Sequence, residues 1–159
     1  MHNITERDAQ VGLSQAWHGL TDVVETIDVK DNVLTKWDVE RKPLTYVDVD
    51  GNEQETGYGI LVGSDDDKII GRPMTPSYKA ISNEKFLDLV SDAMAKLPKA
   101  KIESVGSVCN RGKVFVTVSL DGKSNYKVGD REFNDYLNFG NAHDQTSKLW
   151  INNTNTCTV

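Results

Sequence analysis

The sequence predicts an α+β fold in which a largely antiparallel β-sheet packs one face against a single main amphipathic helix, about residues 83–97. Two observations lead to this prediction. Short β-rich runs separated by turn signals recur along the chain, and one segment has a clear helical period. The length of 159 residues fits one domain.

The ends of the chain and its composition set the expected organisation. We expect residues 1–13 to form a disordered tail, because they are polar and unpatterned, and residues 14–159 to form one domain. No signal-peptide pattern and no apolar run of about 18 residues is present. Cys109 and Cys157 lack metal or redox spacing. The sequence therefore predicts a cytoplasmic protein without membrane association.

The helical segment reads "SNEKFLDLVSDAMAKLP". Its apolar residues recur at the spacing of one buried helical face, namely Phe86, Leu89, Val90, Ala93, Met94 and Leu97. Ser82 or Asn83 can cap its start, and Pro98 stops it. Leu89 lies in the middle of this stripe. We therefore expect Leu89→Ala to lower the stability by about 2–5 kcal/mol.

The β-rich runs fall into two groups. Residues 36–72 contain three runs with turn signals at Asp50-Gly51 and at residues 65–67, which predicts a β-meander. Residues 101–109 and 113–120 flank "NRG" and predict a hairpin. For "EFNDYLNFGNA" the spacing allows helix or strand, and we favour a strand from Tyr136. "KLWIN" is then the next strand, after a turn at "HDQT".

Three residues are candidates for catalysis: His18, His143 and Asp144. A histidine–carboxylate pair can orient an imidazole for base catalysis or metal binding. Adjacent residues of a strand point to opposite faces, so we favour a turn in which Asp144 bonds to backbone amides. His18, in "AWHGL", is either a base or ligand beside an aromatic ring, or a histidine held by hydrogen bonds.

Other patterns of chemical interest are weak. The acidic segments "DVDGNEQE" and "SDDDK" lack the glycine position and flanking helices of a calcium loop, so we interpret them as solvated hairpin turns. The sequence contains no glycine-rich phosphate loop, no GxSxG elbow and no CxxC pair. The tryptophans could stack on bases, although core packing is the commoner role. We predict no metal site and no cofactor.

Charge is distributed unevenly. The net charge is −6, which disfavours general nucleic-acid binding, but residues 98–159 carry eight Lys and Arg against six Asp and Glu. We expect any nucleic-acid contacts in this part, where Arg111 and Lys113 flank a solvated hairpin tip at Gly112. The candidate nucleic-acid-binding residues are Lys99, Lys101, Arg111, Lys113, Lys123 and Lys127.

Four motifs in order resemble the phage/plasmid-like protein family known as domain of unknown function 932: "WHGL", "GRPMTPSYKAISNEKFLDLVSDAM", "IESVGSVCNRGKVFVTVSL" and "NAHDQTSKLWI". The resemblance covers most of the chain after residue 14. The family's H-D-G-S is His143-Asp144-Gln145-Thr146 here, so the turn lacks a glycine. Members of the family continue beyond the segment that "TNTCTV" approaches, which implies that this chain is an N-terminal piece.

The resemblance implies an origin on phages, plasmids or other mobile elements, and the family's activity is largely uncharacterised. The first hypothesis for function is a nucleic-acid-handling accessory that binds or anneals single-stranded DNA. The second is a structural or interaction module that associates with itself or with another protein. The third is a metal-assisted hydrolase that uses His18, His143 and Asp144. The absence of catalytic motifs favours a protein that is not an enzyme.

Overall fold

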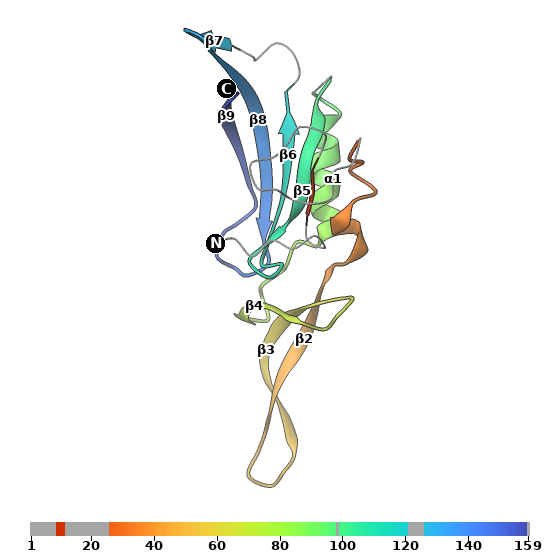
Figure 1. The fold of residues 1–159 in the computed structure, drawn as a ribbon. Coiled ribbons are helices and arrows are strands. Elements are labelled where there is room, and N and C mark those ends of the chain that lie inside the picture. Colours follow the sequence, from red (N-terminus) through yellow and green to blue (C-terminus); the bar gives the residue numbers. More distant parts are fainter. Residues whose placement is uncertain (1–8, 12–25, 98, 121–125, 159) are drawn as a thin grey trace.

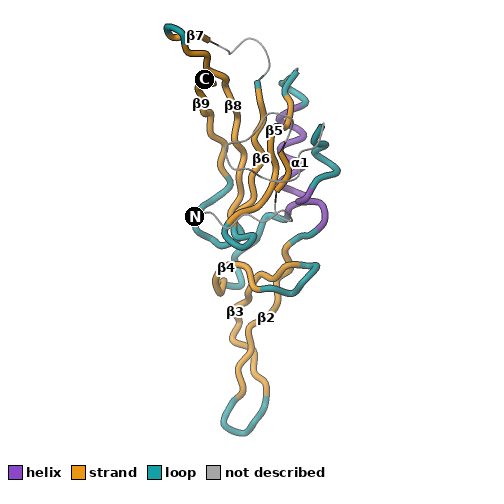
Figure 2. Tube along the Cα trace, in the orientation of Figure 1, coloured by secondary structure: helices purple, strands orange, loops and turns teal. Residues whose placement is uncertain are grey.

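The computed structural model describes residues 9–11, 26–97, 99–120 and 126–158, which form two antiparallel sheets, one 3-10 helix and one α-helix (Figures 1 and 2). The predicted α+β class is confirmed. No helix in these ranges is long and apolar enough to cross a membrane. The elements in chain order are β1 (Ala9–Val11), η1 (Val33–Lys36), β2 (Val39–Val47), β3 (Glu53–Gly63), β4 (Ile69–Met74), α1 (Asn83–Met94), β5 (Lys101–Val108), β6 (Lys113–Ser119), β7 (Tyr126–Val128), β8 (Arg131–Ala142) and β9 (Trp150–Thr158).

The larger sheet has the strand order β1-β5-β6-β8-β7, and β9 also pairs with β8. The hairpin predicted around "NRG" is β5–β6, and the strands predicted from Tyr136 and at "KLWIN" are β8 and β9. All of these pairs are antiparallel. Ala9–Val11 pairs with β5. The segment expected to be a tail, 1–13, therefore includes a short strand, and the rest of it lies outside the described residues.

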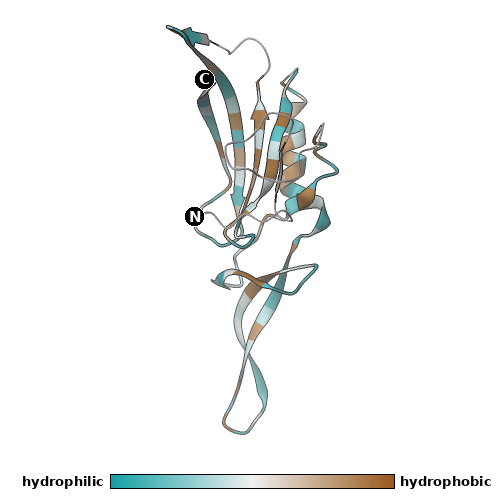
Figure 3. Cartoon of the chain, in the orientation of Figure 1, coloured by the Kyte–Doolittle hydropathy of each residue, from teal (hydrophilic) through white to brown (hydrophobic). Residues whose placement is uncertain are grey.

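The smaller sheet has the order β2-β3-β4 and is the predicted meander. We expected it to belong to the main sheet, but it forms a sheet of its own, and the β2–β3 hairpin projects away from the main sheet (Figure 1). We call its outer part, residues 44–58, the arm. Every residue of the arm except Leu44 and Asp48 is exposed, and most of this region is hydrophilic (Figure 3).

Helix α1 begins as predicted but ends earlier. The side chain of Ser82 caps it by accepting the N–H of Lys85 at 3.2 Å. The helix ends at Met94 rather than residue 97, because the N–H groups of Lys96 and Leu97 bond to carbonyls only three residues back.

The buried face of α1 differs from the predicted stripe. Asn83, Phe86, Leu87 and Val90 are buried, whereas Leu89 is 47% exposed, so the prediction for Leu89 is wrong. The buried positions still follow the spacing i, i+3, i+4, i+7, but they are counted from a polar residue, Asn83. The apolar side chains of this face share one core cluster with sheet residues Val105, Val114, Val116 and Val118.

Two neighbouring leucines test this packing. Leu87→Ala should lower the free energy of unfolding by about 2–5 kcal/mol, because a buried side chain is lost, and Leu89→Ala should cost less than about 1 kcal/mol. Urea denaturation of the two variants and the wild type measures both values. Equal losses, or a larger loss for Leu89→Ala, would show that the helix is rotated relative to this description.

Candidate functional site

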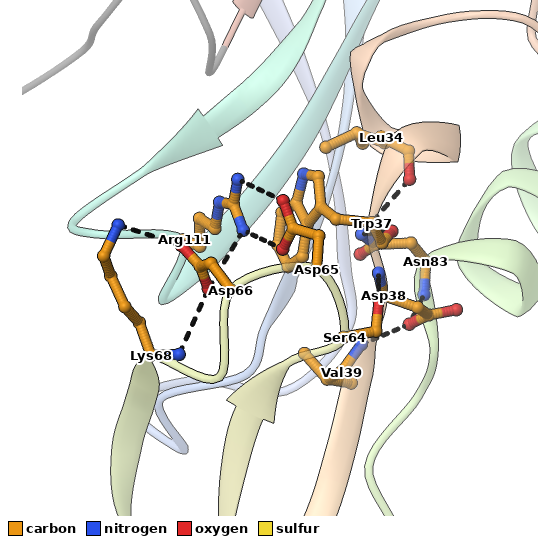
Figure 4. Close-up of polar contacts among 10 residues, drawn as sticks. All are labelled: Leu34, Trp37, Asp38, Val39, Ser64, Asp65, Asp66, Lys68, Asn83 and Arg111. Carbon is orange, nitrogen blue, oxygen red and sulfur yellow. Dashed lines mark hydrogen bonds and ion pairs between the residues drawn. The ribbon is translucent and has the colours of Figure 1, made fainter.

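Hydrogen bonds of Asn83 link the start of α1 to neighbouring segments near the inner end of the smaller sheet (Figure 4). Its Nδ2 donates to the carbonyl oxygens of Trp37 at 2.9 Å and Leu34 at 3.3 Å. Its Oδ1 lies 2.9 Å from Nε2 of His143. Its backbone N–H donates to Oδ1 of Asp38 at 2.8 Å. One residue therefore connects the start of α1 to η1, to Asp38 just before β2 and to the turn after β8.

His143 is a buried, neutral part of this junction. Because Nδ2 of Asn83 donates two hydrogen bonds, its Oδ1 must accept, and Nε2 of His143 carries the proton. The ring is 1% exposed, and burial lowers its pKa to about 4, although Asp38 and Asp144 oppose this shift. Trp37 meets the ring edge-on at 6.0 Å between centroids. The imidazole is therefore enclosed by the residues that join α1 to the two sheets.

Asp144 shapes the turn, as the turn interpretation predicted. Its Oδ1 accepts the N–H of Thr146 at 3.0 Å and the hydroxyl of Thr146 at 2.6 Å. Gly71, with φ +81°, lies against this turn, and a Cβ atom there would come within 2.7 Å of Cα of Asp144. The adjacent side chains of His143 and Asp144 thus bond to different partners.

Arg111 is not the solvated tip residue that we expected. Its guanidinium makes two bonds to Asp65, Nη1–Oδ1 at 2.6 Å and Nη2–Oδ2 at 3.1 Å, and lies 4.6 Å from the ring centroid of Trp37 (Figure 4). The side chain is only 14% exposed. Three successive left-handed residues, 109–111, turn it towards the smaller sheet. These bonds hold the pKa of Asp65 below its usual range.

The two acidic segments lie in hairpin turns, as predicted, and their carboxylates bond within the chain. In "SDDDK", Asp66 pairs with Lys68 at 2.9 Å and Asp67 pairs with Lys42. In "DVDGNEQE", the carboxylate of Asp48 accepts N–H groups within its own turn. No group of three His, Cys, Asp or Glu side chains in the described ranges is arranged to hold a metal ion. His18 lies outside those ranges.

The side of the main sheet away from the core cluster presents a regular set of side chains. Along β6, buried residues alternate with half-buried ones, so Phe115, Thr117 and Ser119 lie on this second side. Of the described helices, none packs over it. The strand register extends it across β8 and β9 as three rows, which we call the outer face: Phe115–Gly140–Trp150, Thr117–Asn138–Asn152 and Ser119–Tyr136–Thr154.

The outer face combines aromatic rings with hydrogen-bonded polar side chains. Phe115, Tyr136 and Trp150 are half-buried. The indole of Trp150 lies over Gly140, where a Cβ atom would come within 2.1 Å of the ring. In the middle row, the hydroxyl of Thr117 donates to Oδ1 of Asn138 at 2.8 Å. The Asn138 amide then donates to the hydroxyl of Thr154 at 2.6 Å. The sheet thus holds these side chains at fixed spacings.

The candidate basic residues do not gather in one place. Lys113 and Lys101 lie at opposite ends of the outer face by register, facing Ala142 and Ser119 respectively. Lys127, on β7, and Lys99, in the turn before β5, are exposed and more distant along the strands. Lys123 lies outside the described residues. Only the pairing register shows that the aromatic residues 115, 136 and 150 share a face, so local sequence patterns did not reveal this set.

No model of a known protein family matches this sequence, and neither a curated protein nor a solved structure matches it. The resemblance to the phage/plasmid-like family therefore stays a prediction.

The buried imidazole makes stability depend on pH. The folded-state pKa of His143, about 4, lies below its ordinary value of 6.5, so the unfolded chain takes up the proton first. The free energy of unfolding therefore has its full value above pH 6.5. It falls by on the order of 3 kcal/mol as the pH drops from 6.5 towards 4. His143→Gln, which keeps a donor for Asn83, should lose this part of the pH dependence. Denaturant unfolding of both proteins across this range measures it, and parallel curves would contradict the assignment.

Proposed function

We propose that the chain is a single-stranded nucleic-acid-binding protein and that the outer face is its binding surface. The observation that carries this proposal is the set of three aromatic rings, Phe115, Tyr136 and Trp150, on one side of an antiparallel sheet. Proteins that bind single strands commonly stack bases on aromatic side chains of a sheet. The Asn and Thr side chains between the rings can bond to base edges, while the opposite side of the sheet packs on α1.

The charge distribution indicates that contacts to phosphates supply only a small part of the proposed binding affinity. Lys101 and Lys113 border the outer face at its two ends, whereas Arg111 is engaged by Asp65. A protein with a net charge of −6 gains little from long-range attraction to a polyanion. Stacking must therefore supply most of the affinity, and the salt dependence should be that of one or two phosphate contacts.

This proposal is consistent with the role of an accessory protein of a mobile element that binds or anneals single-stranded DNA. The metal-assisted hydrolase gains no support from the described residues, because His143 is buried and Asp144 bonds within its turn. For the alternative, a protein-interaction module, the outer face offers no charge pattern that would attract an oppositely charged protein, since its side chains are mostly neutral.

Removing one stacking ring tests the surface. Tyr136→Ala should weaken binding of a fluorescein-labelled oligothymidylate by roughly 5- to 150-fold, the equivalent of about 1–3 kcal/mol for one stacked base. Tyr136→Phe should bind like the wild type, because the ring is kept. Tyr58→Ala, which removes an exposed tyrosine of the arm, is the matched control. Fluorescence anisotropy at low salt gives the dissociation constants; a wild-type protein that binds no oligonucleotide, or equal losses in the two alanine variants, would refute the proposal.

The two lysines that border the outer face, Lys101 and Lys113, are the proposed phosphate contacts. The log–log slope of affinity against salt is negative. Replacing Lys101 and Lys113 by Gln should make it shallower by on the order of 0.7 to 1.4, because each lost phosphate contact accounts for about 0.7. The control replaces Lys85 and Lys96, which are exposed on and just after α1, and should leave the slope unchanged. Titrations at several salt concentrations measure both slopes, and equal slopes in the two double variants would place the phosphates elsewhere.

A further inference from the structure

The arm has two strand edges that no other described strand covers. β4 pairs with β3 only at residues 59–62, so the outer part of β3 pairs with β2 alone. Exposed backbone groups along such an edge can accept another strand. A two-stranded hairpin is marginally stable in water by itself. The length of this projection therefore suggests that the arm has a binding role.

The surface of the arm has an unusual combination of side chains. It exposes Tyr46 at 55%, Val47 at 70%, Val49 at 102% and Tyr58 at 50%. It also carries four acids, and no Lys or Arg occurs from residue 43 to residue 67: the acids are Asp48, Asp50, Glu53 and Glu55. By register Val47 lies opposite Glu53, and Thr45 lies opposite Glu55, so apolar and acidic side chains share one side of the arm.

The tip of the arm is well ordered by its own hydrogen bonds. The carboxylate of Asp48 accepts the N–H groups of Asp50 at 3.0 Å and Asn52 at 2.9 Å and the amide of Gln54 at 3.0 Å. These bonds lower the pKa of Asp48, and Gly51 takes the left-handed conformation that the turn needs. The arm therefore presents its edges in a preorganised form, which reduces the entropy lost on binding.

The two edges differ. On β2, Pro43 and Lys42 protect the edge only where it enters the arm, since proline lacks an N–H group and a lysine discourages pairing. Within the arm, residues 45–47 of β2 and the facing segment of β3 both lack Lys and Pro, but only the β3 segment carries acids, Glu53 and Glu55. Next to it, β4 already pairs with the same strand as far as Gly59. A strand added to β3 would thus continue the line of an existing one.

We propose that this edge of β3 binds an extended, basic segment of a partner protein by strand addition. Positive side chains of the added strand would face Glu53 and Glu55, and its apolar side chains would cover Val47. A second copy of the arm is disfavoured as the occupant, because it would bring four acids against four acids. A nucleic acid is disfavoured for the same reason. This surface is separate from the outer face.

The test uses the whole chain and a labelled ten-residue peptide of alternating Lys and Val as the probe. A peptide of alternating Lys and Pro has the same charge but favours a polyproline conformation over a β-strand and lacks half of the backbone N–H groups. Glu53→Gln/Glu55→Gln should weaken binding of the Lys-Val peptide several-fold to about tenfold. The matched control, Asp88→Asn/Asp92→Asn, removes two exposed acids of α1 and should bind like the wild type. Fluorescence anisotropy gives the affinities.

Hydrogen exchange separates strand addition from simple charge attraction. With the Lys-Val peptide bound, backbone amides within residues 53–56 should exchange more slowly than in the free protein. Absence of binding, equal binding of the Lys-Pro peptide, equal losses in both double variants, or protection elsewhere would each overturn the inference. An oligothymidylate should bind the Glu53→Gln/Glu55→Gln variant as it binds the wild type, so failure of one proposal leaves the other standing.

Discussion

The arrangement of the molecule depends on the side-chain amide of Asn83. This amide is buried, and each of its polar atoms has a partner, namely two carbonyl groups of the η1 segment and the imidazole of His143. Buried polar groups that lose a partner cost about 1–3 kcal/mol each, so these contacts must form together or not at all. They place the start of α1 against η1 and thereby orient its apolar face towards β5 and β6 (Figure 1).

The ion pair between Arg111 and Asp65 is a second connection, and it links the two sheets. It joins the β5–β6 hairpin to the β3–β4 turn, and Trp37 lies under the guanidinium. Among the described residues, the smaller sheet thus contacts the main sheet at its inner end. Its outer end extends into solvent as the arm, with almost every residue exposed. The protein therefore has a well-packed body and a thin projection, and these two parts offer different chemistry to a ligand.

Local signals predicted much of the fold, and distant pairings escaped them. Asp50-Gly51, the "NRG" turn and the periodic segment after Ser82 led to the hairpins and the helix, because turn preferences and helical spacing act over a few residues. Leu89 was assigned to the buried face because the helical stripe was defined from apolar residues alone. The face that is buried instead includes a polar residue, Asn83, and leaves Leu89 exposed. Arg111 was taken as solvated, since its partner lies 46 residues away. The outer face was missed for the same reason: its rows join three strands through their register alone.

The contact between Trp150 and Gly140 has a consequence for how the sheet is completed. After Ile151, β9 reads "NNTNTCT", a polar repeat without the apolar alternation that normally defines which residues of two strands lie opposite each other. Such a strand could slide along β8 with little change in contacts. The indole fits only over a residue without a side chain, and its neighbours along β8, Phe139 and Asn141, offer no such space. The indole of Trp150 at the beginning of β9 therefore fixes the register of β9 against β8 and disfavours other pairings of these two strands.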